Sequence, residues 1–450
     1  MTSISANGAD FALLKDQSYQ RVLPSKTPAE MEYNTVATGP AGSRQVVEFL
    51  ADNSTYTFAN GKAIIRLQSK GILSFQNAML EFSATCSATG SGAYFHNGIW
   101  NWINRVRVLN GSIVVFDQLY KNSMRSMQWS CCRTPETDST FGDACWGVSS
   151  CINRIARASG YNYLIPLDIN LLSSDEIPFD SLQNGLTIEL YLENPQACVN
   201  YVTPSTGSSP TYSINNLRLR CDEVFYQEDL MNKIRSIGTI LLPYTNYKLT
   251  QFTIPAGSNV NMVPIQLRVQ GVKRFLFWFQ NSSDINNSAV PDVKCCEFLK
   301  SGMLFYQLKI DQTYYPPQPV KAQFTSLNDV TGFQEAFFQT ANGLARHEAD
   351  NMIQQRQNNG ETQWNIFRDF LINADMYNNN MFVGVIDLKT FLAHDEDLLT
   401  KFDTTPGNTT IQLNFTLSNS YPLVTTTLNV VAIHSSIGVL DQKGKFFMIE

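Results

Sequence analysis

Apolar and polar residues alternate over short segments along most of the chain, and one arrangement of segments occurs twice. A strand pattern, a short acidic step and an alternating strand follow one another at 163–169, 173–178 and Leu186–Leu192. The same succession returns at 382–388, 394–397 and Ile411–Leu417. Alternation with a period of two is the pattern of a half-buried strand. The repeat therefore predicts two β domains of similar layout in tandem.

Further strand patterns fill both halves, whereas helical patterns are few. Strands are predicted at 63–69, 79–85, 105–109, 112–116, 212–224, 249–254, 263–269, 273–279, 303–310, 423–433 and 445–449. Helical spacing is confined to 117–127, 228–236, 328–344 and 363–371. A parallel-sheet enzyme needs helices between most of its strands. The pattern therefore predicts an all-β fold of two tandem eight-stranded jelly rolls with short helical excursions.

Changes in patterning divide the chain into three regions. Residues 1–44 carry several prolines and no sustained periodicity, which predicts an N-terminal arm. The first jelly roll with its linker is expected at 45–245, the linker occupying 225–247, and the second jelly roll with a C-terminal tail at 246–450. We expect residues 1–40 to be dispensable for folding and to contact neighbouring subunits, minor proteins or a membrane surface.

The clearest local signal is the dipeptide Asn110-Gly111 between two strand patterns. Both residue types tolerate positive φ, which the two central positions of a type I′ turn require. The sequence therefore predicts a two-residue hairpin with Asn110 and Gly111 at its centre.

Composition favours a structural protein. The chain has 450 residues, enough for two or three domains, and an apolar fraction of 43% that can fill large cores. Only 16% of the residues are charged, against about a quarter in ordinary domains. Such a weakly charged surface suits a protein that is covered by copies of itself. The net charge of −6 and the lack of basic runs argue against sequence-specific nucleic-acid binding.

The N-terminus and the cysteines indicate a protein that is not secreted. Residues 1–8 show neither a basic region nor an apolar stretch, so no signal peptide is expected. The nine cysteines include the adjacent pairs Cys131-Cys132 and Cys295-Cys296. Neighbours on a strand point to opposite faces, so free thiols in a reducing compartment are expected.

Four segments resemble chemical sites and are better explained as structure. The acidic stretch with His394 and the group His347, Glu348 and Asp350 lack a second histidine at ligand spacing. The cysteines 131, 132, 145 and 151 lack C-x2-C spacing for zinc, and no Gly-Lys-Ser/Thr follows the glycines of 90–92. We therefore predict no catalytic residue, no metal site and no cofactor.

Two aromatic segments leave alternatives open. The run 275–279, preceded by Lys273 and Arg274, is either a buried strand or a base-stacking platform, and the core is favoured. Residues 314–319 (YYPPQP) contain prolines that cannot donate to a strand ladder. We expect this segment to leave its sheet, either at a subunit contact or as an ordinary strand exit.

In order and spacing these segments resemble the double jelly-roll major capsid proteins of icosahedral double-stranded DNA viruses. The resemblance covers about residues 45–435, and members from virophages and Polinton-like viruses look most similar because the chain is compact. It is carried by the segments 163–169, 176–178, 186–192, 212–224, 272–280, 314–319, 387–388 and 403–404.

The resemblance implies a non-enzymatic virion protein that is made in the cytoplasm or nucleus of a host cell. It implies self-assembly into homotrimers of pseudo-hexameric outline, with minor capsid, penton or cement proteins and an internal membrane surface as further partners. One alternative is a carbohydrate- or receptor-binding β-sandwich protein, such as a spike or minor capsid component. A cupin-type enzyme is a second, but among the histidines only His434 adjoins a predicted strand, directly after 423–433.

Overall fold

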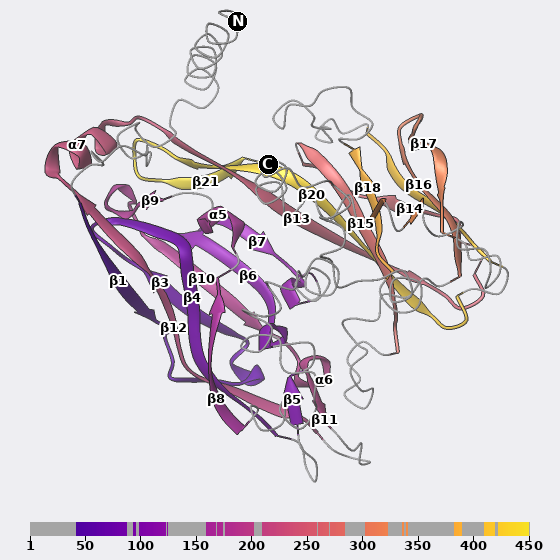
Figure 1. Cartoon of the computed structure of the whole chain (residues 1–450), viewed down its shortest axis with the longest axis horizontal. Helices are drawn as coiled ribbons and strands as arrows, with labels where there is room; N and C mark the ends of the chain where they lie inside the picture. Colours follow the sequence, from indigo (N-terminus) through magenta and orange to yellow (C-terminus); the bar gives the residue numbers. More distant parts are fainter. Residues whose placement is uncertain are drawn as a thin grey trace, which may run out of the picture.

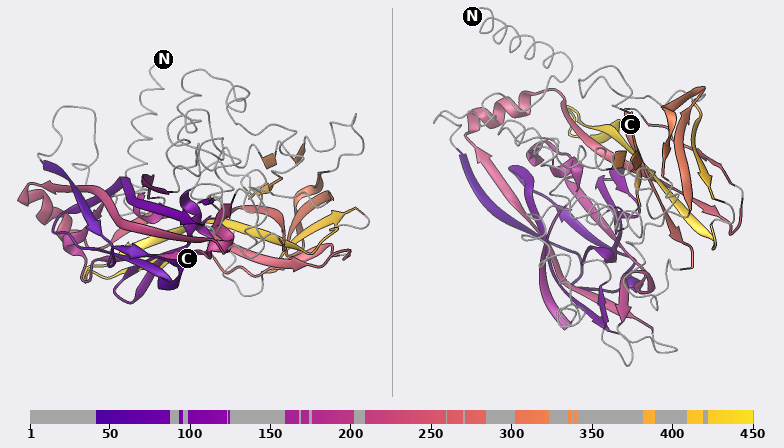
Figure 2. Two further views of the ribbon diagram at one scale, coloured as in Figure 1. Left: turned by 90° about the horizontal axis from the view of Figure 1, so that it is seen from below. Right: turned by 45° about the vertical axis from the view of Figure 1, so that its right-hand side comes forward.

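The computed structural model of the chain shows two β domains side by side (Figures 1 and 2). It describes residues 42–87, 93–95, 99–122, 124, 159–167, 169–173, 176–201, 209–258, 260–269, 271–283, 302–322, 335–336, 339–340, 382–388, 409–418 and 422–449. The predicted N-terminal arm lies outside these ranges up to residue 41, and the first strand begins at Gly42.

The first domain, roll 1, consists of eight principal strands in two facing sheets. These strands are β1 (Gly42–Leu50), β3 (Lys62–Leu67), β4 (Ile72–Ser87), β6 (Ile103–Asn110), β7 (Ile113–Gln118), β8 (Ser159–Pro166), β10 (Leu186–Leu192) and β12 (Thr211–Tyr226). The "β1 sheet" has the order β1-β12-β4-β8, and the "β3 sheet" has the order β3-β10-β6-β7. All pairings within them are antiparallel.

The second domain, roll 2, repeats this plan. Its strands are β13 (Ile240–Ile254), β14 (Met262–Ile265), β15 (Val272–Asn281), β16 (Met303–Ile310), β17 (Thr313–Lys321), β18 (Gly384–Asp387), β19 (Ile411–Leu417) and β20 (Thr426–Leu440). The "β13 sheet" has the order β13-β20-β15-β18, and the "β14 sheet" has the order β14-β19-β16-β17.

The strand order establishes two jelly rolls. If the strands of each roll are counted from one to eight along the chain, both rolls have one sheet in the order 1-8-3-6 and one in the order 2-7-4-5. The predicted tandem jelly rolls are therefore confirmed. The repeated pattern in the sequence is the sixth and seventh strand of each roll, β8 with β10 and β18 with β19.

Short elements join the principal strands. The minor strands are β2 (Thr55–Tyr56), β5 (Ala93–Phe95), β9 (Ile177–Pro178), β11 (Val199–Tyr201) and β21 (Phe446–Ile449). The helices are α5 (Asn170–Ser173), α6 (Pro195–Cys198) and α7 (Glu228–Ser236), with single 3-10 turns η1 (Phe58–Asn60), η2 (Ile99–Trp102) and η4 (Phe179–Ser181). The helix predicted at 228–236 is α7, whose buried Leu230, Met231 and Ile234 pack against Ile72 and Val224.

Each roll has a buried core between its two sheets. In roll 1, Phe82 of the β1 sheet packs edge-on against Trp102, with 5.3 Å between the ring centroids. In roll 2, Phe277 meets Tyr306 of the opposite sheet at 4.9 Å. Alternating positions along each strand supply these side chains, because successive residues point to opposite faces. The alternation seen in the sequence is thus the inward face of each sheet.

Two long strands of roll 2 extend beyond that roll and cover roll 1. β13 and β20 pair over 15 residues, and their far ends run with β21 across roll 1 (Figure 1). Tyr244 and Phe446 belong to the buried core of roll 1. The Phe446 amide donates to Asn110 Oδ1 at 3.1 Å, and the Gln183 amide donates to the carbonyl of Gly444 at 2.9 Å. The two rolls therefore share one buried interface.

The sequence placed the ends of these two strands wrongly. β13 begins at Ile240, inside the predicted linker 225–247, and β20 continues to Leu440 rather than ending at 433. Pro243 resembles a strand breaker, but β13 is an edge strand, where a missing amide donor is tolerated. Residue 245, the predicted division between the rolls, lies inside β13.

The predicted hairpin exists, but its turn lies one residue further along. Asn110 pairs with Ile113, so the central residues are Gly111 and Ser112. Gly111 has a φ of 59°, whereas Ser112 is not among the described residues of positive φ. The predicted type I′ turn is therefore wrong, and the dihedral pattern fits a type II′ turn with glycine at its first central position. Asn110 is a strand residue whose side chain donates to the carbonyl of Gly185.

The helix predicted at 117–127 begins later than expected. β7 continues through Asp117 and Gln118, and helical residues follow at Lys121, Asn122 and Met124. Asp117 stays in the strand because it forms ion pairs with arginines of the neighbouring strand. Residues 125–127, the segment 363–371 and most of 328–344 lie outside the described residues.

Candidate assembly surfaces

The described part of the chain has no group of three or more potential metal ligands. The segments with His347 and His394, the cysteines 131, 132, 145 and 151 and the glycines of 90–92 all lie outside it. Cys86 and Cys221 are free thiols. Within the same ranges, no helix is long and apolar enough to cross a membrane.

The aromatic run 275–279 is core. Phe275, Phe277 and Phe279 point into roll 2, and Leu276 and Trp278 are buried on the other face of the sheet. All five are at most 1% exposed, so a base-stacking platform is excluded at this segment. The prediction that this segment is a buried strand is therefore confirmed.

His434 is buried on β20, and it belongs to no group of three or more potential metal ligands within the described residues. It is 1% exposed, and its Nδ1 lies 3.3 Å from the Ser436 hydroxyl. Burial and, to a lesser extent, the nearby Lys248 ammonium outweigh the hydrogen bond to the Ser435 carbonyl and together lower the pKa of His434 to about 4. The imidazole is therefore neutral at physiological pH.

The proline segment 314–319 stays within β17 (Thr313–Lys321), so the predicted exit from the sheet is wrong, although the ladder is interrupted there. Leu308 pairs with Tyr315 and Tyr306 with Val320, so the residues between Tyr315 and Val320 bulge away from the ladder. The Gln307 side chain donates to the carbonyls of Pro316 and Pro317 and holds this bulge. Because β17 is an edge strand, the bulge interrupts pairing on one side only. Tyr314 is 41% exposed and is available for a contact.

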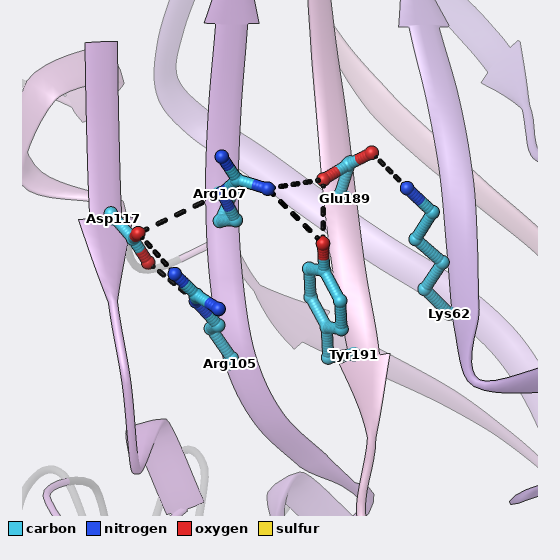
Figure 3. Close-up of polar contacts among 6 residues, drawn as sticks. All are labelled: Lys62, Arg105, Arg107, Asp117, Glu189 and Tyr191. Atoms are coloured by element: carbon cyan, nitrogen blue, oxygen red, sulfur yellow. Dashed lines mark hydrogen bonds and ion pairs between the residues drawn. The ribbon is translucent and has the colours of Figure 1, made fainter. Parts of the chain in front are cut away.

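Charged residues form a connected network on the outward face of the β3 sheet (Figure 3). Inward-facing neighbours such as Val106, Val108 and Ile188 are fully buried, so alternation turns the charged residues outward. The six members come from all four strands of the sheet: Lys62, Arg105, Arg107, Asp117, Glu189 and Tyr191.

Two carboxylates hold the network together. Asp117 accepts from Arg105 Nε at 2.7 Å and lies 3.7 Å from Arg107 Nε. Glu189 pairs with Lys62 and with Arg107 Nη1 at 3.4 Å, and it accepts from the Tyr191 hydroxyl at 3.0 Å. Side-chain contacts therefore link all four strands across the outward face of the sheet.

Glu189 is the buried centre of this network. Burial opposes its ionisation, but hydrogen bonds from Lys62 and Tyr191 outweigh that effect and hold the pKa of Glu189 below its ordinary value. The hydrogen bond to Asp117 likewise raises the pKa of Arg105. Glu189 and Arg105 are therefore both charged at neutral pH.

A second network lies on the outward face of the β1 sheet. Arg218 and Arg220 each bridge Glu48 of β1 and Glu81 of β4. Exposed apolar side chains flank these charges: Val46 is 60% exposed and Leu50 is 70% exposed. Apolar residues next to satisfied charges are common at protein interfaces.

Roll 2 presents different surfaces. The outward positions of β19 are Gln412, Asn414 and Thr416, which are neutral, and β14 adds the exposed Met262. The outward face of the β13 sheet is buried in a cluster of Leu276, Trp278, Val383, Val385, Val431 and Ile433 with Met124. On their outer faces, roll 1 therefore carries networks of paired charges, whereas roll 2 has one covered face and one face that is neutral along β19 and carries Lys309 on β16.

Sequence reasoning did not identify these surfaces. The alternations Arg105-Val-Arg107-Val and Thr187-Ile-Glu189-Leu-Tyr191 contain the signal, because polar residues at every second position must share one face. Which strands lie next to each other, and so which charges meet, depends on the strand order of the jelly roll.

Comparison with known proteins supports the fold. No protein-family model and no curated protein matches the sequence. Among solved structures, the PBCV-1 virus capsid is similar at 10% identity with a TM-score of 0.61, covering 93% of this chain and 99% of that chain. The Sputnik virophage structure has 11% identity, a TM-score of 0.55 and coverage of 94% and 92%. The mavirus major capsid protein has 12% identity, a TM-score of 0.51 and coverage of 94% and 95%.

These matches extend over nearly the whole length of each chain. At identities of 10% to 12% the similarity is one of fold. The protein is a double jelly roll, the fold for which these capsid structures are matched.

Proposed function

We propose that the chain is the major capsid protein of an icosahedral double-stranded DNA virus and that its role is structural rather than catalytic. The observation that supports this best is the double jelly roll itself. Two rolls of identical strand order fill the chain, and the match to capsid structures covers 93% of it and 99% of the PBCV-1 chain. A carbohydrate- or receptor-binding module would need only one such roll.

The proposed assembly unit is a homotrimer. Two similar rolls per chain place six similar rolls around a threefold axis, which gives a pseudo-hexameric outline and allows close packing into a shell. The charged faces of roll 1 and the face of roll 2 that is neutral along β19 supply unlike surfaces for such contacts. Minor capsid, penton or cement proteins and an internal membrane surface are the further partners of this proposal, and the virion is its location.

We also propose α7 as the boundary between the rolls. It follows the last strand of roll 1 and precedes β13. Residues 1–40 are proposed to serve assembly rather than folding.

Light scattering on the purified chain tests the assembly unit. We expect the mass of a trimer at micromolar concentration, and a stable monomer would contradict the proposal. Deleting residues 1–40 separates folding from assembly: the thermal transition of the trimer should stay nearly unchanged while shells form poorly. A deletion variant that fails to fold would show that the arm has a different role.

A further inference from the structure

A hollow of about 620 Å³ opens at one corner of roll 2. Three elements meet there: Lys248 comes from β13, 264–268 from the end of β14 and the segment after it, and 409–412 from the start of β19. In the described part of the chain, β13 and β14 are the edge strands of their sheets. The corner is therefore at the margin of both sheets, where another molecule can approach.

The polar groups that line the hollow are suited to an anion. No carboxylate of the described residues lines it, although the chain has 39 acidic and 33 basic residues. Ammonium, guanidinium, amide and hydroxyl groups donate hydrogen bonds. The residues that supply them are Lys248, Arg268, Gln266, Gln412, Thr409 and Thr410.

The two cations in the hollow are not neutralised within the described residues, where no ion pair involves Lys248 or Arg268. Asp311 lies close by, but it accepts hydrogen bonds from the amide and hydroxyl of Thr410 and is not part of the lining. Two positive charges at one opening attract an anionic partner.

The corresponding corner of roll 1 is closed by a carboxylate of the same chain. After its second strand, Ser69 donates to Glu223, which also accepts from Gln45. Gly185, just before the seventh strand, fits so tightly that an added Cβ would lie 2.5 Å from the carbonyl of Leu67. Glu223 is 8% exposed. In roll 1 a carboxylate of the same chain therefore binds donors beside the second strand, whereas no described carboxylate lines the hollow of roll 2.

We infer that the corner of roll 2 binds a carboxylate side chain of a second copy of the chain. This contact presupposes the proposed self-assembly and adds to it one of the subunit surfaces. A second copy is the occupant because its excess of acidic residues complements the two cations, and because α7 carries an exposed carboxylate, Asp229, that forms no ion pair within the described residues. Charge-assisted hydrogen bonds to Arg268 and Lys248 would fix the carboxylate.

Charge reversal tests the contact. The double variant Lys248→Glu, Arg268→Glu is compared with Arg66→Glu, Lys70→Glu, which makes the same change of charge at the closed corner of roll 1. Both lysines, Arg66 and Arg268 are exposed, so folding should survive, and thermal unfolding of each variant checks it. We expect the roll 2 variant to assemble about tenfold more weakly or worse, with a reduced dependence on salt, and the roll 1 variant to assemble like the wild type.

The remaining outcomes are decisive as well. Equal assembly of the two folded variants and the wild type would overturn the inference and leave the proposed function intact. If the wild-type chain itself stays monomeric, the proposed function fails first. Inorganic phosphate is the probe for a free anion. If phosphate raises the melting temperature of the wild type without changing its assembly, and has no effect on the roll 2 variant, the hollow is a small-anion site. The inference is then wrong. Conservative Lys248→Arg, Arg268→Lys exchange should preserve assembly.

Discussion

The two rolls share one topology but not one way of closing their cores. Roll 2 is enclosed by its own strands, because every member of its main cluster lies within 254–432. Roll 1 borrows Leu242, Tyr244, Leu440 and Phe446 from the extended ends of β13, β20 and β21. Two units of one chain can therefore have the same strand order although one of them takes part of its buried core from the other.

The largest effect is expected at Phe446, at the end of the chain. Its side chain is fully buried in the core of roll 1. Phe446→Ala should lower the free energy of unfolding by about 3–5 kcal/mol, the usual cost of emptying such a site. Chemical denaturation gives the size, and hydrogen exchange should become faster in β7, which β21 contacts. Phe447→Ala, at a half-buried neighbour, is the control; equal losses in both variants would contradict the shared core.

The dependence of roll 1 on strands of roll 2 explains which strands could be predicted from the sequence and which could not. The segments 186–192 and 411–417 were located because alternation marks a strand with one buried face. Residues 240–247 and 434–440 were not assigned to strands, because Pro243 and the serines 435 and 436 interrupt the apolar pattern. Their burial comes from roll 1, far away in sequence, and no local pattern records it. The charged network of the β3 sheet was missed for the same reason: its members meet only through the strand order.

The second effect concerns a position that differs between the rolls. The first residue of the third strand pairs with Val224 in roll 1 and with His434 in roll 2. The folded pKa of His434 is about 4, below its ordinary value of 6.5. Below the ordinary value, the unfolded chain binds a proton that the folded chain does not. Stability is therefore fully present above pH 6.5 and is lost as the pH falls toward 4.

The predicted loss is about 2 kcal/mol between pH 6.5 and 5, where most carboxylates stay ionised. Urea unfolding across this range measures it. His434→Val gives roll 2 the residue of roll 1 and should flatten the pH dependence. A slope that persists in this variant would show that another group is responsible.

The third effect tests the two equivalent hairpins. The turn between β6 and β7 has Gly111 at a φ of 59°, and the turn between β16 and β17 has Asp311 at 53°. Gly111→Val should destabilise the chain by about 1–3 kcal/mol, because a β-branched residue is strained there. Gly111→Asn should cost less, since asparagine tolerates this conformation.

Gly257 is a control that separates backbone strain from crowding. It has a similar φ of 64°, but nothing lies within 4 Å of an added Cβ. At Gly111 the Asn184 side chain would lie 3.1 Å from an added Cβ. Gly257→Val should therefore cost less than Gly111→Val in thermal melts. A wild-type melting temperature for Gly111→Val would contradict the assigned turn. The glycine at position 92 lies outside the described residues.

The smallest effect concerns the charged outer face of roll 1. Glu189→Gln removes the carboxylate that joins Lys62, Arg107 and Tyr191. We expect a loss of about 1 kcal/mol, because both cations keep partial access to water. Gln412→Ala, at an uncharged outward position of β19 in roll 2, should change stability by less. Added salt should narrow this difference, and calorimetry at low and high salt measures it; a difference that widens would contradict an electrostatic origin.

The central claim is that the two joined rolls form a capsid building block, and images of the purified chain in negative stain test it most directly. The account predicts uniform particles with a pseudo-hexagonal outline, six lobes arising from three chains. Single two-lobed particles at all concentrations, with no six-lobed assemblies, would contradict it.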